Sequence, residues 1–228
     1  MATKVVGSGL VGDRVAVIIG VGPGVGASVA RRFGRAGYDV ALVARSPGYL
    51  EELGTELQGQ GVTTGWTPVD IADAPALRAA VERFGRHLGR IDVLHYNPSV
   101  FRQADPLQLD VDDLLEDVRV GVGGLLTAVQ GARPAMLRGA RVLATGSMAA
   151  DEPWNEACSL GVQKAALRNL VRSLDATLAP DGIRAMSLTV RGTLAPDGPF
   201  APERVAEALY AASQTTEDNW QPEVPYAG

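Results

Sequence analysis

Residues 15–26 read Val-Ala-Val-Ile-Ile-Gly-Val-Gly-Pro-Gly-Val-Gly, an apolar run of strand length that passes directly into a glycine-rich turn. Glycine adopts backbone conformations with positive φ and lets a pyrophosphate approach the chain closely. A helix that starts after such a turn adds free backbone N–H groups and the positive end of its dipole. The stretch therefore predicts a cradle for nucleotide phosphates, made by Gly20, Gly24, Val25 and Gly26.

The rest of the chain continues this alternation of strands and helices. Short apolar runs predict strands at 15–19, 40–44, 64–69, 91–95, 141–145, 183–190 and 223–224. Longer amphipathic stretches predict helices at 27–37, 50–59, 74–88, 111–136, 158–178 and 202–213. The pattern is typical of an α/β fold, and it indicates a single doubly wound domain over residues 1–228 with a parallel sheet of about seven strands.

The composition argues against several classes of protein. The formal net charge is −5 and no basic stripe occurs, so we expect no nucleic-acid partner. No apolar run reaches the ~18 residues of a membrane span, and residues 1–4 lead into a glycine-broken stretch that is unlike a signal peptide. The single cysteine, Cys158, suits a reducing cytoplasm. Two histidines and one cysteine predict no metal site.

Spacings along the chain match one known family. Residues 20–26 carry glycines in the order Gly-x-x-x-Gly-x-Gly, Ser147 ends a predicted strand, Leu160 follows thirteen residues later, and Lys164 four after that. With these motifs the chain resembles the short-chain dehydrogenase/reductase family over nearly its whole length. The resemblance implies a Rossmann domain that binds a nicotinamide dinucleotide. It also implies that Leu160 stands where the family has a proton-transferring tyrosine.

The resemblance implies NADP(H) as the cofactor. The second predicted strand lacks the terminal acidic residue that binds the ribose hydroxyls of NAD. Arg45 and Ser46 follow instead, and a guanidinium suits a 2′-phosphate. Asp70 matches a residue that contacts the adenine, although a turn or helix-cap role suits it equally well. The other cofactor-binding positions that the resemblance implies are Asn97, Lys164 and Thr193.

The resemblance also implies which residues form the active site. Ser147 and Lys164 are the catalytic residues that are retained, whereas Gly121 falls where a relay asparagine is expected. A leucine transfers no proton, so the usual acid is missing. The substrate pocket that the resemblance implies consists of Ser99, Met148, Trp154 and Leu160.

Other groups near this pocket could supply a proton, because a buried carboxylic acid with a raised pKa can donate near neutrality. Each of them suits a packing or solvated rim role as well. They are Tyr96, Asp151, Glu152, Glu156 and Cys158. His95 lies in a predicted strand, where we expect a buried histidine with a hydrogen-bond partner.

These features favour an NADP(H)-linked oxidoreductase that acts on a small organic substrate. An iminium ion already carries the charge that hydride neutralises, and an enone can take its proton from water, so both are favoured over a simple ketone. Two alternatives stay open. One is a non-redox cyclase, isomerase or dehydratase on the same scaffold, and the other is a catalytically silent nucleotide-binding protein.

Two features bear on the surroundings of the pocket. The segment 191–201 is short for a substrate lid, so we expect an open pocket or one completed by a partner subunit. The helices predicted at 111–136 and 158–178 carry apolar residues on more than one face. One such face would be exposed in a monomer, which predicts a homodimer or homotetramer.

Overall fold

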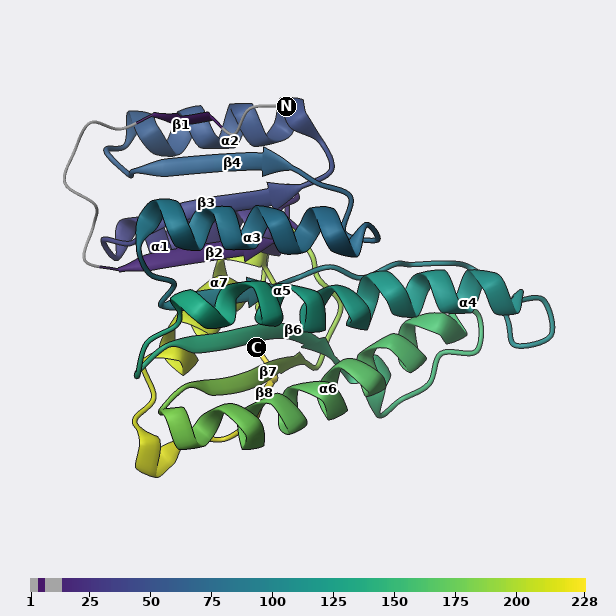
Figure 1. Cartoon of the computed structure of the whole chain (residues 1–228). Coiled ribbons are helices and arrows are strands. Elements are labelled where there is room, and N and C mark those ends of the chain that lie inside the picture. Colours follow the sequence, from purple (N-terminus) through teal and green to yellow (C-terminus); the bar gives the residue numbers. More distant parts are fainter. Residues whose placement is uncertain (1–3, 7–13) are drawn as a thin grey trace.

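The computed structural model describes residues 4–6 and 14–228, and within them it contains one eight-stranded sheet in the order β1-β4-β3-β2-β5-β6-β7-β8 (Figure 1). Strands β2 to β8 pair in parallel, which confirms the predicted parallel sheet of seven strands. The additional strand β1 was not predicted and pairs antiparallel with β4 at the edge. Residues 1–3, part of the stretch judged unlike a signal peptide, lie outside the described residues. The strands are β1 Lys4–Val6, β2 Val15–Ile19, β3 Asp39–Ala44, β4 Thr64–Pro68, β5 Val93–Tyr96, β6 Arg141–Ser147, β7 Arg184–Val190 and β8 Glu223–Tyr226.

The helices lie close to their predicted positions. Ser46 caps the second helix by accepting from the Tyr49 N–H, and Asp73 caps the third in the same way at Ala76. The α-helices are α1 Val25–Arg35, α2 Pro47–Gly59, α3 Ala74–Leu88, α4 Val111–Val118, α5 Gly124–Ala132, α6 Cys158–Leu178 and α7 Pro202–Ser213. The shorter helical segments are η1 Arg119–Gly123, η2 Arg133–Ala135, η3 Met148–Ala150, η4 Ala179–Asp181 and η5 Glu217–Asn219.

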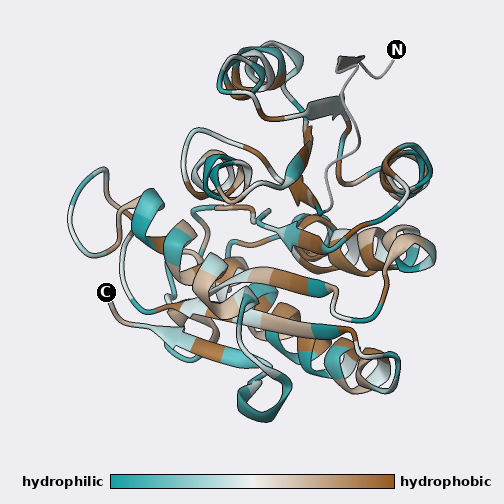
Figure 2. Ribbon diagram, turned by 90° about the vertical axis from the view of Figure 1, so that its left-hand side faces the viewer, coloured by the Kyte–Doolittle hydropathy of each residue, from teal (hydrophilic) through white to brown (hydrophobic). Residues whose placement is uncertain are grey.

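Two hydrophobic cores cover the two faces of the sheet. Along β2 the side chains alternate, so that Val15, Val17 and Ile19 enter one core whereas Ala16 and Ile18 enter the other. The first core packs against α3, α5 and α6, and the second against α1, α2 and α7. Figure 2 shows the resulting layers, with apolar strands between helices whose outer faces are polar. Among the described residues no helix is both long enough and apolar enough to cross a bilayer.

The prediction of a single continuous helix at 111–136 is wrong. The helix is interrupted by η1, a π-helical segment, and the last α-helical turn ends at Ala132. Two tertiary contacts explain the interruption. The Tyr96 hydroxyl donates to the Val120 carbonyl, and a Cβ on Gly124 would lie 2.2 Å from that hydroxyl. Such π-helical turns are frequent at functional sites.

The strand order creates a crevice at one edge of the sheet. The chain runs outward from β2 through β3 to β4, and then returns to the other side of β2 to form β5. Helices therefore leave β2 and β5 toward opposite faces, and the carboxyl ends of these strands are left open. Ligands of doubly wound sheets bind at this switch point.

Candidate functional site

The glycine turn after β2 has the shape that the sequence predicts. Gly20 has φ +82°, and a Cβ there would lie 2.7 Å from the Pro98 ring. A Cβ on Gly26 would lie 2.6 Å from the Gly20 carbonyl oxygen. Gly22 and Gly24 have no atom within 4 Å of an added Cβ. Gly20 and Gly26 are therefore required by the protein's own packing, whereas Gly22 and Gly24 face open space.

Asn97 ties the turn to the neighbouring strand β5. Its side-chain N–H donates to the Gly20 carbonyl oxygen at 3.1 Å, and its backbone N–H donates to Ile19 O at 3.0 Å. The predicted cofactor residue Asn97 thus holds the glycine turn in place, and it also lines the cavity beside it.

Two adjoining cavities open at the carboxyl ends of the strands. The first, of about 380 Å³, lies between the glycine turn, the end of β6 and α6. The second, of about 740 Å³, extends from the same turn across the end of β3 to the chain that follows β5. Gly20, Gly22, Asn97 and Ser99 line both cavities, which therefore form one trough.

The larger cavity contains the residues predicted for the adenosine end of a nucleotide. Arg45 and Ser46 line it, although the Ser46 side chain is also the cap of α2. Asp70 lines it too, and one of its carboxylate oxygens accepts from the Ala72 N–H at 3.0 Å. Asp70 therefore combines the turn role with a place beside the cavity.

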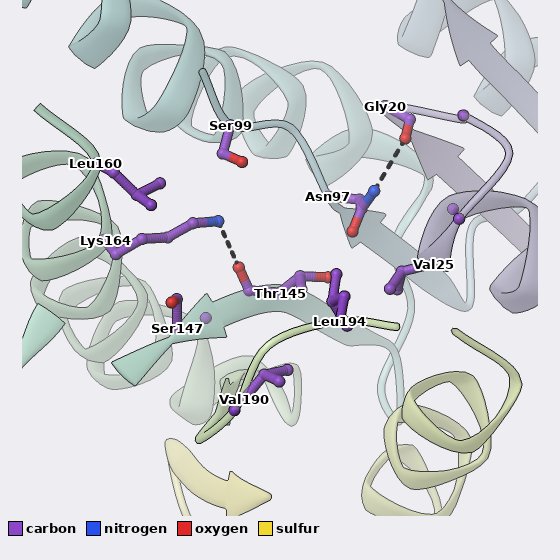
Figure 3. Close-up of a pocket in the computed structure, with 15 residues that line it drawn as sticks. Gly20, Val25, Asn97, Ser99, Thr145, Ser147, Leu160, Lys164, Val190 and Leu194 are labelled. Carbon is purple, nitrogen blue, oxygen red and sulfur yellow. Dashed lines mark hydrogen bonds between the residues drawn. The ribbon is translucent and has the colours of Figure 1, made fainter. Parts of the chain in front are cut away.

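Lys164 is the ionisable side chain at the smaller cavity. It is 5% exposed, and its ammonium group donates to the Thr145 carbonyl oxygen at 2.8 Å (Figure 3). Burial lowers the pKa of Lys164 to about 8. The sequence contains only one other lysine, Lys4, against nineteen arginines. A compact ammonium with three donors is thus used where an arginine would be bulkier and permanently charged.

His95 lies behind Lys164 and is fully buried, as predicted. Its Nε2 is 3.0 Å from the Thr145 hydroxyl oxygen, while its Nδ1 has no partner among the described residues. Burial, and then the nearby Lys164 charge, lower the pKa of His95 to about 3. The imidazole is therefore neutral and adds no second positive charge beside the ammonium group.

Ser147 and Leu160 complete the cavity beside Lys164. The Ser147 hydroxyl oxygen accepts from the Ala149 N–H at 3.2 Å, which leaves its own O–H available as a donor. Leu160 lies one helical turn before Lys164 on the same face of α6. Figure 3 shows these three side chains on one side of the cavity, with Val25 and the glycine turn on the other.

The alternative proton donors do not reach this cavity. Tyr96 is buried, its hydroxyl donates to the Val120 carbonyl, and burial raises its pKa. Asp151 accepts from Arg168 at 2.6 Å and from Arg191 at 3.1 Å, and the Arg168 contact holds the pKa of Asp151 below its usual value. The remaining candidates lie outside the cavity lining: Glu152 and Glu156 are exposed, and Cys158 is half-buried.

Three of the predicted site residues do not line either cavity. Trp154 is 48% exposed and packs on Phe101, with ring centroids 5.6 Å apart. Met148 belongs to the short helix η3, which turns away after Ser147. Thr193 is exposed, and its neighbours Gly192 and Leu194 reach the cavity instead. Leu194 and Val190 therefore line the smaller cavity, whereas the tryptophan does not.

The segment 191–201 is held by the chain's own C-terminal strand. The Arg191 N–H donates to the Tyr226 carbonyl oxygen at 2.8 Å, and the Tyr226 hydroxyl donates to the Pro199 carbonyl oxygen at 2.6 Å. Phe200 and Tyr226 pack edge to face. Leu194, which lies within this segment, lines the smaller cavity.

One residue at the site was missed by the sequence analysis. Gln163 is fully buried, and its side-chain amide exchanges two hydrogen bonds with the Val100 backbone, at 3.0 and 3.1 Å. A Cβ on Gly121 would lie 2.5 Å from the Gln163 Oε1 atom. Gln163 therefore fills the space beside Gly121 and fixes the loop that carries Ser99. No local pattern could reveal it, because its partners lie 42 and 63 residues away in the sequence.

The residues present suit a dinucleotide but not a metal. The open space over Gly22 and Gly24 is the room that a pyrophosphate needs beside a backbone cradle. Within residues 4–6 and 14–228, no group of three or more His, Cys, Asp or Glu side chains is arranged to hold a metal ion.

Comparisons with known proteins agree with this geometry. The family described as short chain dehydrogenase matches residues 14–196. The oxidoreductase UcpA of Escherichia coli K12 is 32% identical over 181 residues, which is 77% of this chain and 67% of that protein. A short chain dehydrogenase from Burkholderia cenocepacia, solved in complex with NADP, is 25% identical with a TM-score of 0.84 and covers 94% and 96% of the two chains. An alcohol dehydrogenase from Thermococcus sibiricus, complexed with 5-hydroxy-NADP, is 25% identical with a TM-score of 0.82 and covers 93% and 95%.

Proposed function

Because the chain belongs to the short chain dehydrogenase family, we propose that it is an NADP(H)-dependent oxidoreductase that acts on a small organic molecule. The observation that carries this proposal is the continuous trough at the switch point of the sheet. One end of the trough has the glycine cradle and Arg45, and the other has Lys164 and Ser147. This order matches that of a dinucleotide followed by a substrate.

The preference for NADP(H) rests on Arg45. Arg45 and Ser46 line the larger cavity at the end of β3, and Ala44 leaves no carboxylate there for ribose hydroxyls. A guanidinium pairs with a 2′-phosphate through two parallel hydrogen bonds. The Burkholderia relative with NADP bound supports the same cofactor here.

The proposed chemistry follows from what faces the smaller cavity. A bound NADPH would supply hydride. Lys164 would hold the nicotinamide ribose, and Ser147 would donate a hydrogen bond to the substrate. Leu160 occupies the position that we assign to the family's tyrosine, and it has no proton to give. We therefore expect substrates whose reduction needs little acid at oxygen, namely imines or enones rather than simple ketones.

Titration with NADPH and NADH tests the cofactor. We expect NADPH to bind at least about tenfold more tightly, or about 1.4 kcal/mol. Arg45→Ala should remove that preference. Arg204→Ala is the matched control, because Arg204 is exposed on α7 and lines neither cavity. Equal affinities of the wild type for both nucleotides would contradict the assignment of Arg45.

A panel of carbonyl compounds, imines and enones tests the reaction. We expect the absorbance of reduced nicotinamide to fall with an imine or an enone, and to change little with simple ketones. A product that forms without any change in this absorbance would instead indicate a non-redox enzyme. Binding of NADPH without turnover of any compound would indicate a nucleotide-binding protein.

A further inference from the structure

The smaller cavity carries a single positive charge and no negative one. Fifteen residues line it, and Lys164 is the only ionisable side chain among them. The Asp151 carboxylate is paired with Arg168 and Arg191 and lies outside the lining. His95, behind the lysine, is neutral. A cationic substrate would therefore meet an ammonium group with nothing to balance it.

Two polar groups of the cavity, the Lys164 ammonium and the Ser147 hydroxyl, keep hydrogen-bond donors available for a ligand. An ammonium has three N–H groups, and the one bond found for Lys164 among the described residues goes to the Thr145 carbonyl oxygen. The Ser147 hydroxyl accepts from the Ala149 N–H and so keeps its O–H for a ligand. The Asn97 side-chain amide donates one hydrogen bond to the Gly20 carbonyl oxygen. With one ammonium N–H on Thr145 and a second on the nicotinamide ribose, Lys164 keeps a third donor, so that Lys164 on α6 and Ser147 on β6 can both donate to an oxygen that carries negative charge.

Four apolar side chains also line the cavity. Val25, Leu160, Val190 and Leu194 surround the space next to these donors. Leu160 lies beside the ammonium group and offers neither a proton nor an acceptor. Such a site suits a molecule with a hydrocarbon body and one carbonyl oxygen.

We infer that the substrate is a neutral α,β-unsaturated carbonyl compound, reduced at its C=C bond, whose oxygen is held by Ser147 and Lys164 as it becomes an enolate. This inference rests on the proposed function and chooses between its two substrate classes. The enone is favoured because its reduction develops negative charge at oxygen, where the two donors lie. An iminium ion is disfavoured because it brings a second positive charge to Lys164.

The reaction balances without a tyrosine. The β-carbon gains a hydride from the reduced nicotinamide, the C=C electron pair moves toward the carbonyl, and the oxygen takes the negative charge. The α-carbon then gains a proton from water, so hydride and proton together give the saturated carbonyl compound and NADP⁺. The enolate is less basic than the alkoxide of a ketone reduction, because its charge is shared with carbon. Hydrogen-bond donors alone therefore suffice to stabilise it.

Product analysis with two probes tests the substrate class. The probes are 2-cyclohexen-1-one and the 2-methyl-3,4-dihydroisoquinolinium ion, each supplied with NADPH. We expect cyclohexanone from the first, without cyclohexenol, and little reduction of the second. Ser147→Ala should lower kcat for the enone by about 10²-fold, the usual effect of removing one such donor. Ser159→Ala is the matched control, because Ser159 is buried on α6 outside the cavity and should leave turnover unchanged.

A binding experiment without turnover tests the oxygen site itself. The probe is 4-nitrophenol, an enolate mimic whose anion absorbs visible light, added to the protein saturated with NADP⁺ at mildly acidic pH. We expect the bound probe to ionise and to be displaced by 2-cyclohexen-1-one. Lys164→Met should abolish the ionisation, and Ser147→Ala should weaken it.

Three outcomes would overturn parts of this argument separately. Reduction of the iminium ion but not of the enone would overturn the inference and leave the oxidoreductase proposal standing. Bound 4-nitrophenol that stays protonated, or that ionises equally well in both variants, would also overturn the inference. No NADPH oxidation with either probe would overturn the reduction step together with the proposed function, even where the phenolate is bound.

Discussion

Replacing Lys164 by methionine should make the nucleotide-free protein more stable at pH 7. Folding removes the ammonium group from water, and this lowers its pKa from 10.5 to about 8. At about 1.36 kcal/mol for each pKa unit, the difference corresponds to a cost of about 3 kcal/mol. The lost hydrogen bond to the Thr145 carbonyl offsets about 1 kcal/mol of the gain. The expected net gain is about 2 kcal/mol, or roughly 4–8 °C in Tm for a chain of this size.

The gain should shrink as the pH rises. Below about pH 8 the folded and the unfolded wild type both carry the charge, so the full cost of its burial is present. Between about 8 and 10.5 the folded state has released the proton while the unfolded state still binds it. The stability of the wild type therefore rises toward that of Lys164→Met in this interval.

Thermal and urea unfolding at pH 7 and about pH 9.5 measure this difference. Gln163→Met serves as a control with the opposite sign, because it removes two hydrogen bonds and leaves the backbone N–H and C=O of the half-buried Val100 without these partners. It should destabilise the protein by about 1–3 kcal/mol. A Lys164→Met variant less stable than the wild type at pH 7, or a gain that is as large at pH 9.5, would refute the desolvation argument. A residue that costs stability and is nevertheless present suggests a functional role.

Other changes at the site have equally definite expected results. Leu160→Tyr should raise ketone reduction by roughly tenfold or more, since it supplies the missing acid, and steady-state assays with simple ketones would show whether it does. Gly121→Asn alone should lower Tm because its Cβ collides with Gln163, whereas the double variant with Gln163→Ser should recover most of the loss in the same melt. Gly26→Ala should weaken NADPH binding at least tenfold in titrations, because the new methyl group would push the Gly20 carbonyl out of place. Light scattering at micromolar concentration should give a dimer or tetramer, since apolar side chains on α4 are exposed; a monomer mass would contradict this.

The apolar and glycine patterns of the sequence were sufficient to predict the order of strands β2 to β8 and of the helices between them, but not the edge strand β1 or the break at η1. Runs such as 15–19 are buried on both faces, and their continuous hydrophobicity reflects that directly. The helix predicted at 158–178 has the observed bounds because its apolar residues recur at helical spacing. The proposed cofactor end could be predicted in part for a similar reason, because Gly20 directly follows the apolar run of β2 and Arg45 directly follows that of β3, whereas the close approach of Pro98 to Gly20 could not be predicted.

The tertiary structure decided the features that depend on contacts between distant segments. The break in the helix at η1 lies where Tyr96 of β5 contacts Val120 and leaves room only for glycine at position 124. Trp154 packs on Phe101 and not at the cavity, whereas Leu194 lines the cavity in the segment 191–201, which β8 holds through Tyr226. The depressed pKa of Lys164 likewise follows from burial behind β6. Local patterns encode which faces of the chain are apolar, but only packing sets which side chains meet, and the charge at a site depends on that packing.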